Sequence, residues 1–190
     1  MEKYGAGLIV ISAYDPTWPI LFEEESVRIK KALGSFALAI EHVGSTAVPG
    51  LPSKPIIDLL VGVPSLQEAK ERCMGPIKEL GYIYKPEYVS WLPGEMFFRK
   101  GPPGPWTHHV HLTEPSHPRW EARLVFRDYL RAHPEAAQAY AKIKCSLATS
   151  SKDDIEAYRT GKNTFVEETT AKACAWRAEV QNQSQRQINE

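Results

Sequence analysis

The chain has 190 residues, of which 43% are hydrophobic and 24% are charged, and this composition is ordinary for a soluble globular protein. Its 23 basic and 23 acidic residues cancel, so no overall field attracts nucleic acid or anionic lipid, and we expect neither as a partner. Three widely spaced cysteines suit a reducing compartment, and neither a signal peptide nor a membrane-length apolar run is recognisable, so we expect a cytoplasmic protein.

The first part of the chain predicts strands alternating with a helix. A β-branched run over residues 7–14 predicts a first strand. A helix should follow, capped by Asp15 and ended by Gly34. The short apolar runs 36–44 and 54–63 predict buried strands joined by a loop rich in glycine and proline.

The middle and the end of the chain predict more strands and then helices. Residues 65–81 predict a helix capped by Ser65 and kinked at Gly75-Pro76. Three short strands are expected within residues 82–92, 95–100 and 106–114, with a rigid turn over Gly101–Pro105 between the last two. Helices are expected over Arg119–Ala132, after Pro134 and from near Asp153, and the polar end from Ser184 should be frayed.

This order of elements predicts one α+β domain over residues 1–170, and not a repeating βαβ fold. Its sheet core should span about residues 8–115, and its helical part should span about residues 117–170. Residues 171–190 are expected to be the end of a helix and a frayed tail. The predicted fold class is therefore mixed α+β, with a helical C-terminal third.

Two features suggest chemistry in the first half of the chain. Gly44, Ser45 and Thr46 form a turn in which a glycine allows close approach and the hydroxyls and amides can donate to phosphate. Asp58 stands inside the apolar run "PIIDLLVGV", where an unpaired carboxylate would cost several kcal/mol. We expect Asp58 to be paired with a cation such as Lys54 or to hold a metal ion.

These features carry a resemblance to a known family. The string "EHVGSTAVPGLPSKPIIDLLVGV" resembles the GrpB family, and so do "YDPTWPILFEEE", "HVHL" and "RDYLRAHPEAAQAYAKIK". The resemblance covers about residues 8–150 and implies the nucleotidyltransferase-like fold, a mixed β-sheet flanked by helices. In that superfamily a Gly-Ser turn follows the first strand, and an Asp-x-Asp pair on the next strand holds Mg²⁺.

The resemblance places Gly44 and Ser45 on the Gly-Ser turn and Asp58 on the first metal-binding aspartate. The position of the second aspartate is occupied by Leu60, and this residue cannot hold a metal ion. Two alternatives follow. Either the protein binds a single metal with other ligands, or it binds a nucleotide or phosphate without transferring it.

Histidines are candidates for the missing ligands. His109 and His111 are two residues apart on a predicted strand, so they share one face, and His108 points to the other. We expect His42, Asp58, His109 and His111 to form a cluster that binds metal or phosphate or supplies a general base. Half-buried histidines with ordinary hydrogen bonds are the alternative.

Basic residues complete the list of candidates. Lys54 and Arg99 are expected phosphate ligands, although Arg99-Lys100 also suits a solvated strand end. For the helical region we expect ordinary surface charge at Arg127, Arg131, Lys142 and Lys144. The aromatic residues are expected in the core, namely Trp91, Trp106, Trp120, Tyr129 and Tyr140.

The sequence thus predicts a protein that binds a nucleotide or another phosphorylated small molecule together with Mg²⁺ or Mn²⁺. Nucleotidyl transfer is one hypothesis, in which Asp58, His109 and His111 are catalytic. A binding module without catalysis is the second, and a His/Asp transition-metal hydrolase is the third. GrpB-like domains also occur joined to dephospho-CoA kinase, so the resemblance implies a link to coenzyme A metabolism.

Overall fold

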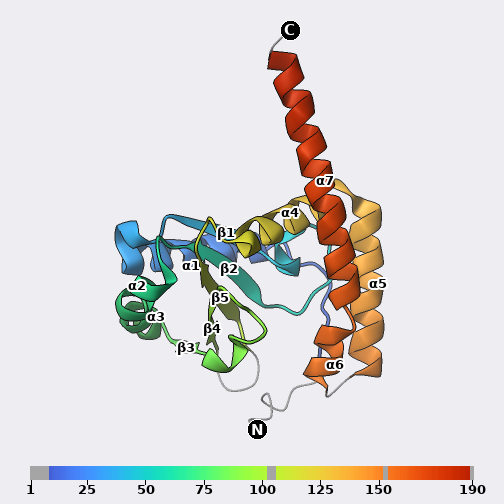
Figure 1. Ribbon diagram of the computed structural model, residues 1–190. Coiled ribbons are helices and arrows are strands. Elements are labelled where there is room, and N and C mark those ends of the chain that lie inside the picture. The colour runs from blue at the N-terminus through green and yellow to red at the C-terminus, as the bar shows by residue number, and fades with distance from the viewer. Residues whose placement is uncertain (1–8, 102–105, 152–153, 189–190) are drawn as a thin grey trace.

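A five-stranded mixed sheet forms the centre of the molecule (Figure 1). The structure is a computed structural model and describes residues 9–101, 106–151 and 154–188. The strand order is β1-β2-β5-β4-β3, with β1 Ala39–Val43, β2 Ile57–Gly62, β3 Tyr82–Tyr84, β4 Met96–Lys100 and β5 His108–Thr113. Of the pairings in this sheet, β2 with β5 is parallel and the other three are antiparallel. The predicted α+β class is confirmed.

One face of the sheet is covered by the helices of the N-terminal half. These are α1 Trp18–Leu33, α2 Leu66–Arg72 and α3 Met74–Glu79. Alternate strand residues such as Leu59, Phe98 and Leu112 meet Ile29 of α1 in one continuous apolar core. Hydrophobic burial therefore holds this face together.

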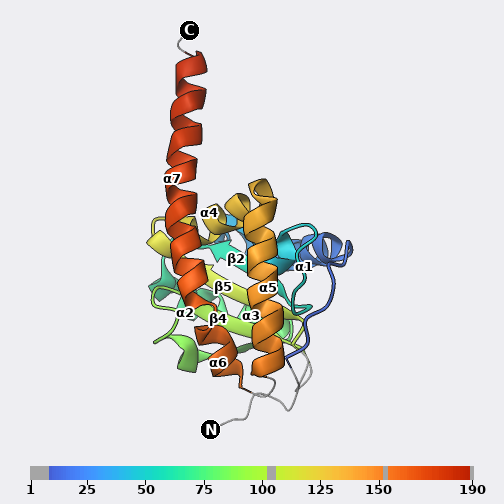
Figure 2. The same ribbon diagram turned by 90° about the vertical axis from the view of Figure 1, so that its right-hand side faces the viewer.

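The other face is covered by the helices of the C-terminal third, α4 Pro118–Ala132, α5 Pro134–Ser150, α6 Ile155–Thr160 and α7 Asn163–Ile188. Figure 2 shows α5 and the first half of α7 side by side in front of the sheet, and the rings of Tyr140 and Phe165 stack between them at 5.1 Å. The last turns of α7 extend beyond the rest of the molecule. No helix in the described ranges is long and apolar enough to cross a membrane.

The predicted first strand over residues 7–14 is wrong for the part that the structure describes. Only an isolated bridge between Ser12 and Ser53 forms there. The helix after it begins at Trp18 with Thr17 as its N-cap residue, two residues later than the predicted cap at Asp15 implies. The cause is local, since Oδ1 of Asp15 accepts hydrogen bonds from the backbone N–H and hydroxyl of Thr17 and holds a turn.

Two further boundaries differ from the prediction. The helix predicted over residues 65–81 is capped by Ser65 as expected, but it breaks at Cys73 and not at Gly75-Pro76. Pro76 has no N–H for the carbonyl four residues earlier, so the regular bonding fails in advance of the proline. The C-terminal tail is helical as far as Ile188. The turn predicted over Gly101–Pro105 lies outside the described residues, apart from Gly101.

Candidate functional site

Asp58, His109 and His111 converge on the face of the sheet that the C-terminal helices cover. The parallel register pairs Asp58 with His109 and Leu60 with His111, which puts all four side chains on one face. Nδ1 of His109 lies 2.9 Å from Oδ1 of Asp58, and Nε2 of His111 lies 3.9 Å from the same oxygen. One ligand atom from each of the three residues falls within 4.8 Å of the others.

His42 does not join this cluster. Its register partner is Leu59, so it points to the opposite face of the sheet, where its ring stacks on Phe22 at 4.7 Å. Its Nε2 lies 3.0 Å from the hydroxyl of Thr46, which itself donates to the carbonyl of Ile56. Burial lowers the pKa of His42 to about 4, so the ring is neutral at pH 7. The prediction of a four-residue cluster is therefore corrected to three residues.

The Gly-Ser-Thr turn packs directly against the carboxylate of Asp58. Gly44 has a φ of +72°, and a Cβ built there would lie 2.3 Å from Oδ2 of Asp58. Only glycine satisfies both constraints. Ser45 is half-buried at the start of a short 3₁₀ turn, Ser45–Ala47. The Thr46 hydroxyl is occupied by its internal hydrogen bonds, so that hydroxyl does not fit its predicted phosphate role.

A buried carboxylate behind the cluster orients His111. Nδ1 of His111 lies 2.7 Å from Oε2 of Glu95, whose side chain is fully buried. Arg123 of α4 donates two hydrogen bonds to the same carboxylate, at 2.9 and 2.8 Å. Burial alone would raise the pKa of Glu95, but Arg123 and His111 hold it well below its usual range. Since Glu95 accepts at Nδ1, Nε2 of His111 is left as the lone-pair nitrogen that faces Asp58.

The protonation states suit metal binding. Burial acts to raise the pKa of Asp58, but its contacts with His109 and His111 outweigh burial and hold that pKa well below its usual range. Burial also lowers the pKa of His109 to about 4. An ionised carboxylate thus lies beside a neutral imidazole, which is the form that binds metal ions. Nε2 of His109 is buried and has no hydrogen-bond partner among the described residues.

Lys54 is not the ion-pair partner of Asp58. Its ammonium lies over the ring of Tyr158, 5.2 Å from the centroid, and no ion pair between described residues joins it to a carboxylate. Burial, together with the charge of Lys162, lowers the pKa of Lys54 to about 8. His109 takes the place beside Asp58 that the sequence assigned to a cation.

Arg99 and Lys100 lie on opposite faces of β4. Arg99 is the register partner of His109 and therefore shares its face, and only 8% of Arg99 is exposed. Its guanidinium lies 4.7 Å from the ring centre of Tyr88. Lys100 pairs with Glu25 at 2.8 Å on the other face. The solvated strand end considered for Arg99-Lys100 is therefore wrong for Arg99.

Several residues of the helical third also differ from expectation. Lys144 is 1% exposed and donates to the carbonyl of Pro52, and Arg127 pairs with Glu41 at 2.7 Å, so neither is simple surface charge. Trp91, expected in the core, is 45% exposed. The guanidinium of Arg159 lies 3.8 Å from its ring centre.

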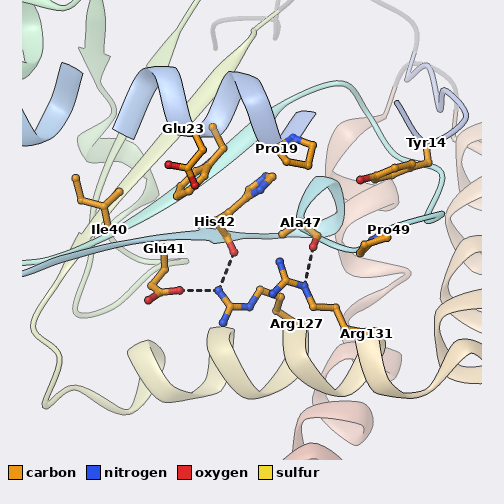
Figure 3. Close-up of a pocket in the computed structure, with 11 residues that line it drawn as sticks. Tyr14, Pro19, Glu23, Ile40, Glu41, His42, Ala47, Pro49, Arg127 and Arg131 are labelled. Atoms are coloured by element: carbon orange, nitrogen blue, oxygen red, sulfur yellow. Dashed lines mark hydrogen bonds and ion pairs between the residues drawn. The ribbon is translucent and has the colours of Figure 1, made fainter. Parts of the chain in front are cut away.

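A cavity of about 380 Å³ lies elsewhere, between the start of α1, β1 and α4 (Figure 3). His42, Arg127 and Arg131 line it, and Asp58 and the two histidines of the cluster do not. Arg127 donates to Glu41 and to the carbonyl of His42, and Arg131 donates to the carbonyl of Ala47. Because these arginines already serve the fold, the group at Asp58 is the stronger candidate site.

The ligand set points to a particular class of ion. Two imidazoles and one carboxylate suit zinc, iron or manganese, whereas Mg²⁺ prefers oxygen ligands. Ligand atoms bound to one such ion at roughly 2.1 Å can lie up to about 4.2 Å apart, and the distances from Asp58 Oδ1 fall below that limit. The structure thus holds a possible metal-binding His/Asp group, and it does not identify the ion.

Comparison with known proteins supplies the family context. The family model described as "GrpB protein" matches residues 8–172. The chain is 39% identical over 169 residues to the UPF0157 protein YqkA of Bacillus subtilis, covering 89% of this chain and 48% of that protein. It therefore spans about half the length of this relative.

A solved structure and a longer relative are also similar. The crystal structure of the conserved protein GrpB from Enterococcus faecalis matches with a TM-score of 0.78 and 35% identity, covering 86% of this chain and 96% of that one. A protein named dephospho-CoA kinase from Mycolicibacterium paratuberculosis is 31% identical over 186 residues. The match covers 85% of this chain and 45% of that protein, so more than half of the kinase lies outside it.

Proposed function

The chain belongs to the GrpB family, and we propose that it binds one divalent metal ion at Asp58, His109 and His111 and a nucleotide or other phosphorylated small molecule beside it. The observation that carries the proposal is the convergence of three ligand atoms within 4.8 Å on a buried sheet face. The turn at Gly44 and the lysine at position 54 adjoin this group. We assign the phosphate to that side of the site.

Glu95 and Arg123 support the metal assignment. A histidine that binds a metal almost always donates a hydrogen bond from its other ring N–H to a carboxylate or carbonyl, and this bond fixes the tautomer. His111 has such a partner in Glu95, and Arg123 fixes Glu95 in turn. A purely structural histidine would not need its second nitrogen directed at another carboxylate.

The same group limits the chemistry. Leu60, the register partner of His111, is fully buried and brings no second carboxylate. Glu41 and Glu95 are both paired with arginines. We therefore propose a single-metal site and not the two-metal arrangement of the nucleotidyltransferases. The bound ion would polarise a phosphoryl oxygen, and the proposed reaction is transfer of a nucleotidyl group.

A binding module without catalysis is the second candidate, and Leu60 is the observation that favours it. Loss of the second carboxylate removes the ligand that would align attacking and leaving oxygens. The relatives named dephospho-CoA kinase suggest a role near coenzyme A metabolism for either candidate. Turnover of nucleoside triphosphates, with and without dephospho-CoA as acceptor, separates the two candidates when wild type is compared with Asp58→Asn.

Metal content tests the proposal directly. Protein dialysed against Mn²⁺ or Zn²⁺ and then against buffer should retain one ion per chain by elemental analysis. Asp58→Asn and His111→Gln should lose it. His108→Gln is the matched control, because His108 lies on the same strand and faces the other way. Equal metal content in wild type and Asp58→Asn would overturn the proposed site.

A further inference from the structure

Four basic side chains from different parts of the chain gather beside the metal group. Lys54 precedes β2, Lys144 is on α5, Arg159 is on α6 and Lys162 lies between α6 and α7. The ammonium groups of Lys54 and Lys162 lie 5.2 and 5.4 Å from the ring centre of Tyr158. Helices of the C-terminal third thus bring positive charge to the same end of the sheet as Asp58.

Among the residues that the structure describes, these cations have no carboxylate partners. None of the ion pairs among the described residues involves any of the four. The arginines on the Glu95 and Glu41 side behave differently, since Arg123 and Arg127 are both paired. The chain as a whole carries equal numbers of acidic and basic residues, so this excess is local.

One of the cations, Lys144, is buried, and a second, Lys54, is half-buried, so both lose part of their contact with water. Lys144 is almost completely inside the protein, and within the described part of the chain its ammonium donates to the carbonyl of Pro52 at 2.5 Å. Burial and the charge of Lys162 lower the pKa of Lys144 to about 7 and that of Lys54 to about 8. Buried charges normally have a counter-ion. A bound anion would supply one.

We infer that Lys54, Lys144, Arg159 and Lys162 form a polyanion site that holds a chain of two or three phosphate groups of the ligand. This inference rests on the proposed function, and it names the feature of the phosphorylated molecule that is recognised. A single phosphate would leave most of the positive charge unmatched, whereas a di- or triphosphate matches four cations. Arg159 stacks on Trp91, and this places the exposed ring of Trp91 at the rim of the same site.

Calorimetric titration of metal-free protein with inorganic tripolyphosphate tests the inference. Lys162→Gln and Lys54→Met should each weaken binding by about tenfold or more, because each removes a charge-assisted contact. Neither side chain makes a hydrogen bond or ion pair within the described residues, so the fold should tolerate both changes. The control is Lys142→Gln on the exposed side of α5, with an expected change of about twofold or less.

The outcomes separate this inference from the proposed metal site. Asp58→Asn should lose the metal ion yet bind tripolyphosphate at least as well as wild type, since it removes a negative charge. The inference would be overturned if wild type does not bind tripolyphosphate, even if it binds metal. It would also be overturned if Lys162→Gln and Lys54→Met bind tripolyphosphate as tightly as wild type. Tighter binding of a single-stranded oligonucleotide than of tripolyphosphate would overturn the assignment to a small molecule.

Discussion

The two faces of the sheet are stabilised by different physics. On the face covered by α1, α2 and α3, residues such as Leu59, Val61 and Leu112 meet an apolar helix surface with no exposed area. On the face covered by α4 to α7, the same strands carry Asp58 and His111, which bond to other polar groups. Strand alternation makes this possible, because neighbouring residues serve opposite purposes.

The contrast explains where function lies. An apolar face is stable without ligands, and it has no polar groups to which a charged ligand could bind. A polar face needs every charge to be paired. Here Glu95, Glu41 and their arginines are paired, while Lys54 and Lys162 near Tyr158 have no ion pair with any residue in the described ranges. The C-terminal helices therefore do more than cover the sheet. They bring the charges that complete its polar face.

The largest effect should come from breaking the buried pair on the polar face. Arg123→Met leaves the Glu95 carboxylate buried without its main partner and should cost roughly 3–5 kcal/mol in urea unfolding at pH 7. Arg119→Met, which removes a longer contact of 3.8 Å to the same carboxylate, should cost about 1 kcal/mol or less. Equal costs for the two variants would contradict this account of the polar face.

The same pair predicts a pH dependence with a definite sign. The pKa of Glu95 is depressed in the folded state, so its stabilisation is complete above the unfolded value of 4.5 and is lost as pH falls below that value. Wild type should therefore lose stability between pH 5 and pH 3 by roughly 2 kcal/mol more than Arg123→Met does. Parallel pH profiles would show that Glu95 is not the titrating group.

Substitutions of two adjacent leucines on β2 compare what the two sheet faces contribute to stability and to metal binding. Leu59→Ala and Leu60→Ala each create a cavity at a fully buried position and should each cost about 3 kcal/mol by urea unfolding. Only Leu60→Ala should also weaken metal binding, because Leu60 is the register partner of His111. Loss of metal from Leu59→Ala would mean that the apolar face contributes to the site.

A pair of glycines tests the close approach to Asp58. Gly44→Ala introduces both an unfavourable φ and a clash with the carboxylate, so it should cost about 2–3 kcal/mol and abolish metal retention. Gly50 has a φ of +77° and open space around it, so Gly50→Ala should cost only about 1 kcal/mol and leave metal binding intact. Thermal unfolding without Mn²⁺ measures the loss of stability, and the rise of the unfolding temperature on addition of Mn²⁺ measures metal binding.

The smallest effect is expected at His42. His42→Phe keeps the stacking on Phe22 and removes one hydrogen bond to Thr46, at a cost of about 1 kcal/mol. Metal content should not change, because His42 is on the apolar face. A drop in bound metal would restore this histidine to the ligand set and contradict the register argument.

Much of the fold could be predicted from local patterns. The short apolar runs became β1 and β2, and Ser65 capped its helix as expected, since both depend on neighbours in sequence. The failure over residues 7–14 has a tertiary cause. A β-branched run becomes a strand only where a neighbouring strand edge is available, and in residues 9–14, the part of this segment that the structure describes, the only bridge is the one to Ser53.

A site residue could be predicted where a polar side chain stood among apolar residues in the sequence. Asp58 stood out because a carboxylate inside an apolar run requires a partner. Glu95 and Arg123 gave no such signal, since one precedes a strand and the other lies on an amphipathic helix, and only folding joins them. Lys144 had a signal that could have been used, because it is four residues after the buried Tyr140 and so shares its helix face.

The parallel pairing of β2 with β5 has a consequence for how the protein assembles. Asp58 and His109 are 51 residues apart in sequence, and α2, α3, β3 and β4 lie between them. Closing so long a loop is among the later and slower events on a folding path. A metal ion that needs both ligands therefore cannot guide early folding. Binding of the proposed ion would instead report that the long-range pairing of β2 with β5 has formed, and it would slow the opening of that pairing thereafter.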